Sequence, residues 1–373
     1  MPGDDTPGKT NRRRFLKATG GLAGAGLLAG CTGGGGTTTQ QTPTPKVVEK
    51  TKVVEKTKVV EKTPTPQQQY TTELAVSHYP TIPDTVPFQV AMDQGFYQKH
   101  DVDVKKISSF SGGGTTVRGI VTGGIGMGGT ALPALIKAYL AGAPIYLSGI
   151  IVAFPPIDFH VLPDSPIKTI QDAAGKKIAV SNPGSSSEAM AIASVQNAKG
   201  ISVKDIDIMY AGGLGEALTA MTQGAADISW NIPPVSQEYI QGGKSRRVWK
   251  ASDYAPNITE LVLAVGGNVK QHEPELAKNL LAAQIESYDW IKANVKEASQ
   301  IWAKTAKLDE SIALEALKDV QPDKMYNIEL KQDILTSTAE TMIAQGLIDK
   351  QPPWKDIVWQ EPLPADKQVS WLK

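Results

Sequence analysis

Short apolar runs alternate with stretches of helical apolar spacing over residues 74–302, and this alternation is the feature that most constrains the fold. Such alternation is typical of repeated strand–helix–strand units, which build a largely parallel sheet. The rest of the chain has helical spacing, most clearly over residues 276–293 and 334–347. The sequence therefore predicts an α/β fold completed by C-terminal helices.

The predicted strands are the apolar runs at residues 74–76, 102–104, 125–129, 145–152, 178–180, 206–210 and 226–230. The predicted helices between them are residues 87–98, 115–122, 131–141, 188–198 and 215–223. Two further extended segments, residues 158–162 and 261–264, are interpreted as crossovers between two parts of the chain.

Length supports a division of this globular part into two lobes. Residues 70–373 are long for one hydrophobic core, given a prior of roughly 150 residues per domain. With the crossovers as boundaries, residues 70–157 and 262–373 form lobe 1, and residues 158–261 form lobe 2. Two lobes make a ligand cleft possible.

Residues 1–30 carry an export address. Arg12 and Arg13 precede a weakly apolar run that ends at Gly30, the pattern of a twin-arginine signal. A membrane-spanning helix needs about 20 apolar residues, so this run is too short and is interpreted as a cleaved signal. Leu28-Ala29-Gly30-Cys31 resembles a lipobox, which predicts that Cys31 is lipidated. We expect an exported chain held by its lipid alone to the outer face of the cytoplasmic membrane.

A low-complexity linker is predicted at residues 31–69. Three consecutive KVVEKT hexapeptides occupy residues 46–63, and a TPTP sequence lies at each end of the repeats. The period of six fits neither a heptad nor a solenoid repeat, and the segment has too little apolar surface to offset ordering its backbone. The sequence predicts a disordered stalk.

Composition and motifs exclude several classes of protein. Residues 1–30 hold five Lys/Arg and two Asp/Glu, so removing them changes the balance from 38 against 38 to 33 against 36, which does not suggest nucleic-acid binding. No HExxH, paired CxxC or GxSxG motif occurs, and we expect no metal, cofactor or catalysis. Gly124, Gly126 and Gly129 satisfy GxGxxG, but residues 130–157 lack the acidic residue that dinucleotide binding requires.

Four segments resemble one family of proteins. They are Asp93-Gln94-Gly95-Phe96-Tyr97 followed by residues 101–104, residues 130–144, residues 170–180, and Ala217-Leu218 with Gly224 and Ala226-Asp227-Ile228. Together they resemble the type II periplasmic binding proteins of the nitrate, sulfonate, taurine and thiamine-precursor group. Gly126 departs from the pattern, since many relatives have an aspartate there.

The resemblance implies two α/β lobes joined by two crossovers, with a ligand in the cleft and hinge closure on binding. It also implies that the closed form delivers its solute to the permease and ATPase of an ABC importer. We expect a monomeric head.

Candidate ligand-binding residues lie at the carboxyl ends of predicted strands, where helix N-termini present free N–H groups to an anion. They are Ser77, His78, Tyr79, Phe110, Ser111, Gly112, Gly113, Gly114, Thr115, Gly129, Thr130, Ser181, Asn182, Gly184, Ser185, Ser186, Trp230 and Asn231. Because these loops are rich in Gly, Ser and Thr, we expect a small anionic solute of the sulfonate, taurine or nitrate class. The same serines and threonines could instead serve as helix caps.

Two other functions remain open from the sequence. His78, Tyr79, Phe110 and Trp230 could stack on a ring, which favours a heteroaromatic thiamine-precursor pyrimidine. The scaffold could also serve as a sensor subunit that takes no part in transport. A pyrimidine-precursor synthase is disfavoured, because such enzymes carry a cysteine-rich segment and this head has no cysteine.

Overall fold

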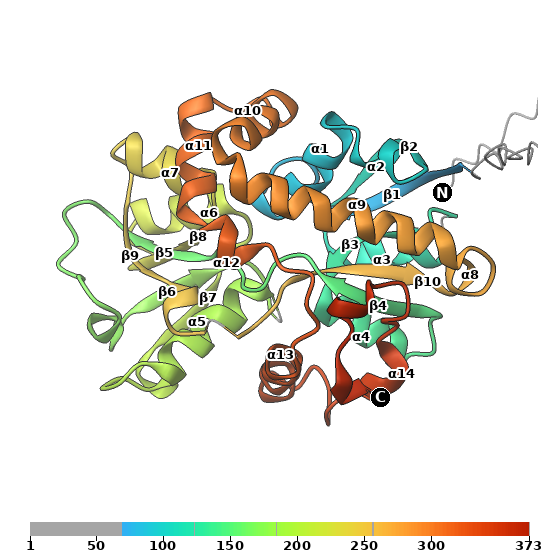
Figure 1. Cartoon of the computed structure of the whole chain (residues 1–373). Coiled ribbons are helices and arrows are strands. Elements are labelled where there is room, and N and C mark those ends of the chain that lie inside the picture. Colours follow the sequence, from blue (N-terminus) through green and yellow to red (C-terminus); the bar gives the residue numbers. More distant parts are fainter. Residues whose placement is uncertain (1–68, 123, 184, 256, 373) are drawn as a thin grey trace, which may run out of the picture. The chain divides into compact units, whose positions relative to one another are not determined.

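The computed structural model describes residues 69–122, 124–183, 185–255 and 257–372. Within these residues the chain forms two five-stranded sheets with helices packed around them (Figure 1), so the predicted α/β class is confirmed. The predicted export signal, Cys31, the repeat-containing linker and Gly184 lie outside the described residues.

The first sheet has the strand order β2-β1-β3-β10-β4. Its strands are β1 (Tyr70–Ser77), β2 (Val102–Phe110), β3 (Met127–Ala131), β4 (Ile145–Ile150) and β10 (Leu261–Gly266). β1 is parallel to β2 and β3, whereas β10 is antiparallel to β3 and β4. The helices along this part of the chain are α1 (Val86–Asp93), α2 (Phe96–Lys99), α3 (Gly113–Thr122) and α4 (Leu132–Leu140).

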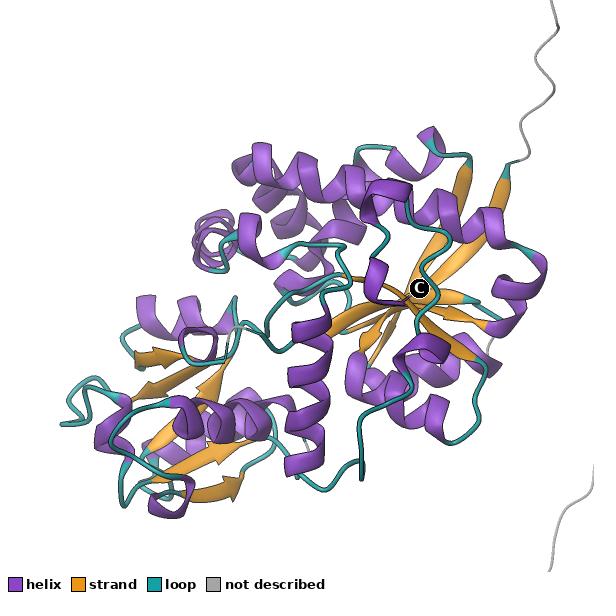
Figure 2. Ribbon diagram, turned by 60° about the horizontal axis from the view of Figure 1, so that its bottom comes forward, coloured by secondary structure: helices purple, strands orange, loops and turns teal. Residues whose placement is uncertain are grey.

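The second sheet repeats this layout in the order β7-β6-β8-β5-β9. Its strands are β5 (Asp158–Val161), β6 (Lys177–Val180), β7 (Asp207–Tyr210), β8 (Ile228–Asn231) and β9 (Arg246–Lys250). β6 is parallel to β7 and β8, and β5 is antiparallel to β8 and β9. The helices here are α5 (Ser186–Asn197), α6 (Leu214–Thr222) and α7 (Val235–Gln241). Figure 2 shows the strands gathered in two separate groups.

The C-terminal part of the chain is helical, as predicted. It comprises α8 (Gly267–His272), α9 (Pro274–Ala293), α10 (Val295–Ala306), α11 (Glu310–Asp319), α12 (Pro322–Met325), α13 (Gln332–Ala344) and α14 (Trp354–Ile357). The long helix α9 packs against α1 and α2, and its buried face joins the same apolar core as the first sheet. None of the helices in the described residues is both long and apolar enough to cross a membrane.

The middle of the first sheet depends on a close backbone approach. Gly128 on β3 lies beside Ala75 on β1, and a Cβ atom at Gly128 would come within 1.7 Å of the Ala75 carbonyl oxygen. No rotamer change relieves a clash with backbone, so only glycine fits this position. Packing against a neighbouring strand thus explains Gly128 in the predicted strand at residues 125–129.

Three predicted elements differ from the structure. The helix expected at residues 87–98 is broken, because Gly95 adopts the left-handed conformation (φ 71°) and separates α1 from α2. The segments expected to be crossovers, residues 158–162 and 261–264, are instead strands β5 and β10. Each is buried and pairs with a strand on both sides, whereas a crossover would leave its backbone groups outside a sheet.

Candidate functional site

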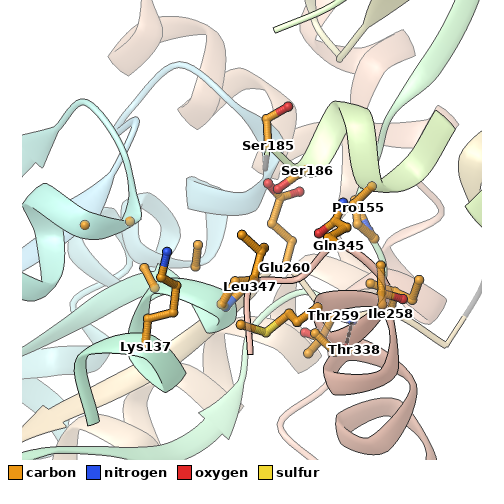
Figure 3. Close-up of a pocket in the computed structure, with 18 of the residues that line it drawn as sticks. Lys137, Pro155, Ser185, Ser186, Ile258, Thr259, Glu260, Thr338, Gln345 and Leu347 are labelled. Carbon is orange, nitrogen blue, oxygen red and sulfur yellow. Dashed lines mark hydrogen bonds between the residues drawn. The ribbon is translucent and has the colours of Figure 1, made fainter. Parts of the chain in front are cut away.

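A cavity of about 480 Å³ lies where α3 and α4 of the first sheet meet the N-terminus of α5 beside the second sheet. The segment that leads into β10 and the C-terminal end of α13 complete its wall. Figure 3 shows Glu260, Ser186, Gln345 and Lys137 around it. Residues that bind at this place would come from both halves of the sequence.

The first half contributes the N-terminus of α3. Gly113 and Gly114 line the cavity, and a Cβ atom at Gly114 would meet nothing within 4 Å. The Gly113 carbonyl accepts a hydrogen bond from Thr130 Oγ1 at 3.0 Å, which fixes the start of the helix against β3. The first N–H groups of a helix lack partners within it, so this end favours negative charge.

The second half contributes the N-terminus of α5. Ser185 caps this helix, since its hydroxyl accepts a hydrogen bond from the Glu188 N–H at 3.3 Å. Ser185 and Ser186 both line the cavity. The N-terminus of α3, beside the first sheet, and that of α5, beside the second sheet, therefore border the same space. This arrangement suits an anion.

The cavity also contains a carboxyl group that sequence patterns did not indicate. The Ser186 hydroxyl hydrogen-bonds the Glu260 side chain, and burial raises the pKa of Glu260 above its ordinary value. A second carboxyl group, Asp84, lies close enough to interact with it. Burial first, and then the charge of Glu260, raise the pKa of Asp84 well above its ordinary value. Lys137 on α4 provides a positive charge at the solvent side.

Only part of the predicted site lines this cavity. The predicted residues on its wall are Gly113, Gly114, Ser185 and Ser186. The remaining described candidates lie elsewhere, namely Ser77, His78, Tyr79, Phe110, Ser111, Gly112, Thr115, Gly129, Thr130, Ser181, Asn182, Trp230 and Asn231.

Several of these other candidates already have structural roles. Ser77 is buried and shares a 2.7 Å hydrogen bond with Thr116 on α3. Phe110 packs against Gly119, and Trp230 packs against the cores beneath the second sheet. Asn231 is buried and donates to Ser229 at 3.3 Å.

Some residues of the wall were missed because their signal is not local. Glu260 lies just before β10, Lys137 lies within α4, and Thr338, Met342 and Gln345 belong to α13 or its end. The sequence predicts that the chain returns to the first lobe at residues 261–264. Glu260 directly precedes this segment, and that position was the one sign in the sequence that Glu260 could lie at a binding site. The spacing of apolar residues in α13 is the same whether the helix lines a cavity or packs only against the core.

Solved structures with this fold support the architecture. The periplasmic aliphatic sulphonate binding protein SsuA from Escherichia coli superposes with a TM-score of 0.67 and 20% identity, over 81% of this chain and 96% of that chain. The alkanesulfonate-binding protein SsuA from Xanthomonas axonopodis pv. citri, bound to MOPS, superposes with a TM-score of 0.64 and 16% identity, over 79% of this chain and 99% of that chain. The fold is therefore that of a periplasmic binding protein, as the sequence predicted.

The same fold also occurs in an enzyme. The desulfurization enzyme DSZB superposes with a TM-score of 0.58 and 16% identity, over 78% of this chain and 97% of that chain. Fold alone consequently does not separate binding from catalysis. A comparison with the sequences of curated proteins gives no match.

Family membership is decided by sequence. The model of the family described as NMT1/THI5 like matches residues 82–298, which is more than half of the 373 residues. The matched region begins after β1, just before α1, and ends within α10, so it contains every other strand of both sheets together with Gly113, Ser185 and Glu260. The chain belongs to the NMT1/THI5-like family.

Proposed function

We propose that this protein is the extracytoplasmic solute-binding component of an ABC importer and that its ligand is a small organic anion of the sulfonate class. The observation that carries the proposal is the meeting of two helix N-termini, those of α3 and α5, at one cavity. Each carries roughly half a positive charge, and both would act on the same anionic group.

The cavity walls favour an aliphatic anion over a planar ring. Its apolar lining consists of residues such as Val117, Met190, Ile258 and Leu347, and no aromatic side chain occurs among the described residues that line it. His78, Tyr79, Phe110 and Trp230 lie outside that lining, so they offer no stacking surface there. SsuA from Escherichia coli is named as a binding protein for aliphatic sulphonates, which agrees with this choice.

We further propose that residues 70–157 and 262–373 form one lobe and residues 158–261 the other, and that the lobes close on the solute before a monomeric head docks on the permease. Binding, not catalysis, is the proposed activity, because the two SsuA structures with this fold are named as binding proteins. Arg12 and Arg13 would direct export, and lipidated Cys31 would hold the chain at the membrane. Finding Cys31→Ser protein still in the membrane fraction would count against the anchor.

A ligand screen that measures thermal unfolding of the full chain by calorimetry tests the ligand class. The panel holds alkanesulfonates, nitrate, aromatic carboxylates and thiamine-precursor pyrimidines. A true ligand at about 100 times its Kd should raise the free energy of unfolding by about 2.7 kcal/mol. Binding of a pyrimidine without binding of any sulfonate would overturn the proposal.

A matched pair of variants tests the site. Ser185→Asp keeps a good N-cap on α5 but puts a carboxylate beside the proposed anion, so sulfonate affinity should fall at least about tenfold while stability is preserved. Ser202→Asp makes the same change at the exposed cap of the short helix Val203–Asp205, and it should leave affinity unchanged. Equal affinities in both variants would show that α5 does not face the ligand.

A further inference from the structure

Helix α11 of the C-terminal part of the chain is bound to the second sheet through polar groups. The apolar face of α11, with Ala313, Ala316 and Leu317, belongs to the same core as the first sheet. The described members of the cores beside the second sheet include no residue of α11. Figure 1 shows α11 beside α7, and hydrogen bonds and ion pairs link α11 to α7 and β9. Such a contact can break without exposing either apolar core to water.

Asp319, the last residue of α11, is the centre of these bonds. Its carboxylate accepts hydrogen bonds from Arg247 Nη1 at 3.1 Å and from Lys250 Nζ at 2.8 Å, and Arg247 Nη2 donates to its second oxygen. Lys250 also donates to the main-chain carbonyl of Asp319 at 2.9 Å. A guanidinium group bonded to both carboxylate oxygens fixes orientation as well as distance. We refer to Arg247, Lys250 and Asp319 as the interlobe cluster.

Asp158 keeps Arg247 in position on the second sheet. Its Oδ2 lies 2.9 Å from Arg247 Nη2, and Asp158 is 2% exposed. Arg247 would therefore keep one carboxylate partner if α11 moved away, and separation would leave no buried arginine without a counter-charge. The guanidinium group would also stay oriented to bind Asp319 again. The interlobe cluster is thus built to break and re-form.

The interlobe cluster lies apart from the candidate ligand site. Pro155 and Ile258 line the candidate cavity, on the two segments that join the sheets. Their neighbours Phe154 and Asn257 instead line a second cavity of about 480 Å³, together with Lys250 and Asp319. Among the described residues that line the candidate cavity, none belongs to the cluster. An effect of the cluster on ligand affinity must therefore act through the arrangement of the lobes.

We propose that the interlobe cluster holds the two lobes in the arrangement in which the N-termini of α3 and α5 border one cavity, and that breaking it lets the lobes separate. The cluster thereby sets the fraction of molecules that are ready to bind, and apparent affinity is proportional to that fraction. Asp319 is a positioning residue, because it acts on binding without touching the ligand. The inference rests on the two lobes and the ligand cavity of the proposed function.

A distance between the lobes tests the proposal on the full chain without any ligand. Spin labels are placed at Lys204→Cys and Lys304→Cys, which are exposed positions on the two lobes. The background is Cys31→Ser, because Cys31 is the only cysteine of the chain. Pulsed electron paramagnetic resonance should show a second population at a different distance in Asp319→Asn. A distribution equal to that of the parent protein would overturn the proposal and leave the proposed function standing.

Glu286→Gln is the matched control for this measurement. The Glu286 side chain is 29% exposed and that of Asp319 is 23% exposed, and each carboxylate pairs with two basic side chains. The partners of Glu286 are Lys99 and His100, which lie in the same lobe as Glu286. Removing this charge should therefore leave the distance between the lobes unchanged.

Calorimetric titration with ethanesulfonate tests the consequence for binding. Asp319→Asn should weaken the affinity at least about threefold, by the same factor as the parent-like population falls in the distance measurement. A bismaleimide cross-link between Gln241→Cys and Glu315→Cys, which replace a side-chain contact of α7 with α11, should restore the affinity of Asp319→Asn. A loss that the cross-link does not restore would mean that Asp319 only supports the fold, and it would overturn the proposal. If the parent protein binds no ethanesulfonate, the proposed ligand class fails, and the distance measurement alone decides the role of the cluster.

Discussion

Asp84 combines deep burial with incomplete hydrogen bonding. It is 1% exposed, and its Oδ1 has no hydrogen-bond partner among the described residues. Glu260 and Tyr326 are the ionisable groups that interact with it. Folding therefore favours the protonated form of Asp84, while the unfolded chain releases that proton near the ordinary pKa.

The first prediction follows from this linkage. The folded-state pKa of Asp84 lies above the unfolded value of 3.8, so its stabilising effect is complete below that pH and is lost as pH rises through the folded-state pKa. Each unit of pKa difference corresponds to about 1.4 kcal/mol. Asp84→Asn should flatten the fall in unfolding free energy between pH 4 and pH 8, measured by urea denaturation. Exposed Asp93→Asn should keep the wild-type slope, and an unchanged slope in Asp84→Asn would contradict the argument.

At the scale of helices and strands, the sequence predicts those parts of the site that depend on local patterns. The strands were identified because a buried strand is a short apolar run, and a glycine-rich turn marks where each helix starts. Gly113, Gly114, Ser185 and Ser186 were found because they lie at such turns. Strand pairing is not local, so the sequence predicts crossovers where the structure has the paired strands β5 and β10. For the same reason, the approach of α13 and of Glu260 to α3 left no trace in the pattern.

The N-terminus of α3 provides a second prediction with an internal control. A Cβ atom on Gly113 would come within 2.8 Å of the Cβ atoms of Ala131 and Ala134, whereas one on Gly114 would meet nothing within 4 Å. Gly113→Ala should force α3 and α4 apart and lower the free energy of unfolding by about 1–3 kcal/mol. Gly114→Ala should raise it by about 0.5–1 kcal/mol, because alanine favours the helix. Chemical denaturation measures both, and equal effects would refute the close packing of α3 on α4.

At the scale of the whole molecule, an ion-pair cluster joins the second sheet to the C-terminal helices. Asp319 at the end of α11 accepts hydrogen bonds from Arg247 and Lys250 of β9, and Arg247 also contacts buried Asp158 on β5. Burial acts to raise the pKa of Asp319, but the hydrogen bonds from Lys250 and Arg247 outweigh it and lower that pKa below its ordinary value.

The third prediction concerns this cluster. Asp319→Ala leaves two largely covered cations without their partner, so the free energy of unfolding should fall by about 2 kcal/mol, less than for a fully buried pair. Glu315→Ala removes an exposed contact of the same two regions, with Gln241 on α7, and should cost under about 0.5 kcal/mol. Urea denaturation at pH 7 distinguishes the two, and a small effect of Asp319→Ala would mean that the cluster adds little stability.

The insertion of β10 between β3 and β4 also determines when each half of the molecule can be completed. All five strands of the second sheet come from one continuous stretch, residues 158–250, whereas β3 and β4 of the first sheet have no common partner until residues 261–266 are present. A chain whose residues up to 255 have emerged from the ribosome would therefore hold a complete second sheet beside a first sheet with open strand edges. Such edges pair readily with other chains. Ribosome-stalled or truncated chains of this protein should accordingly aggregate through the first sheet, and they should cease to do so once β10 has emerged.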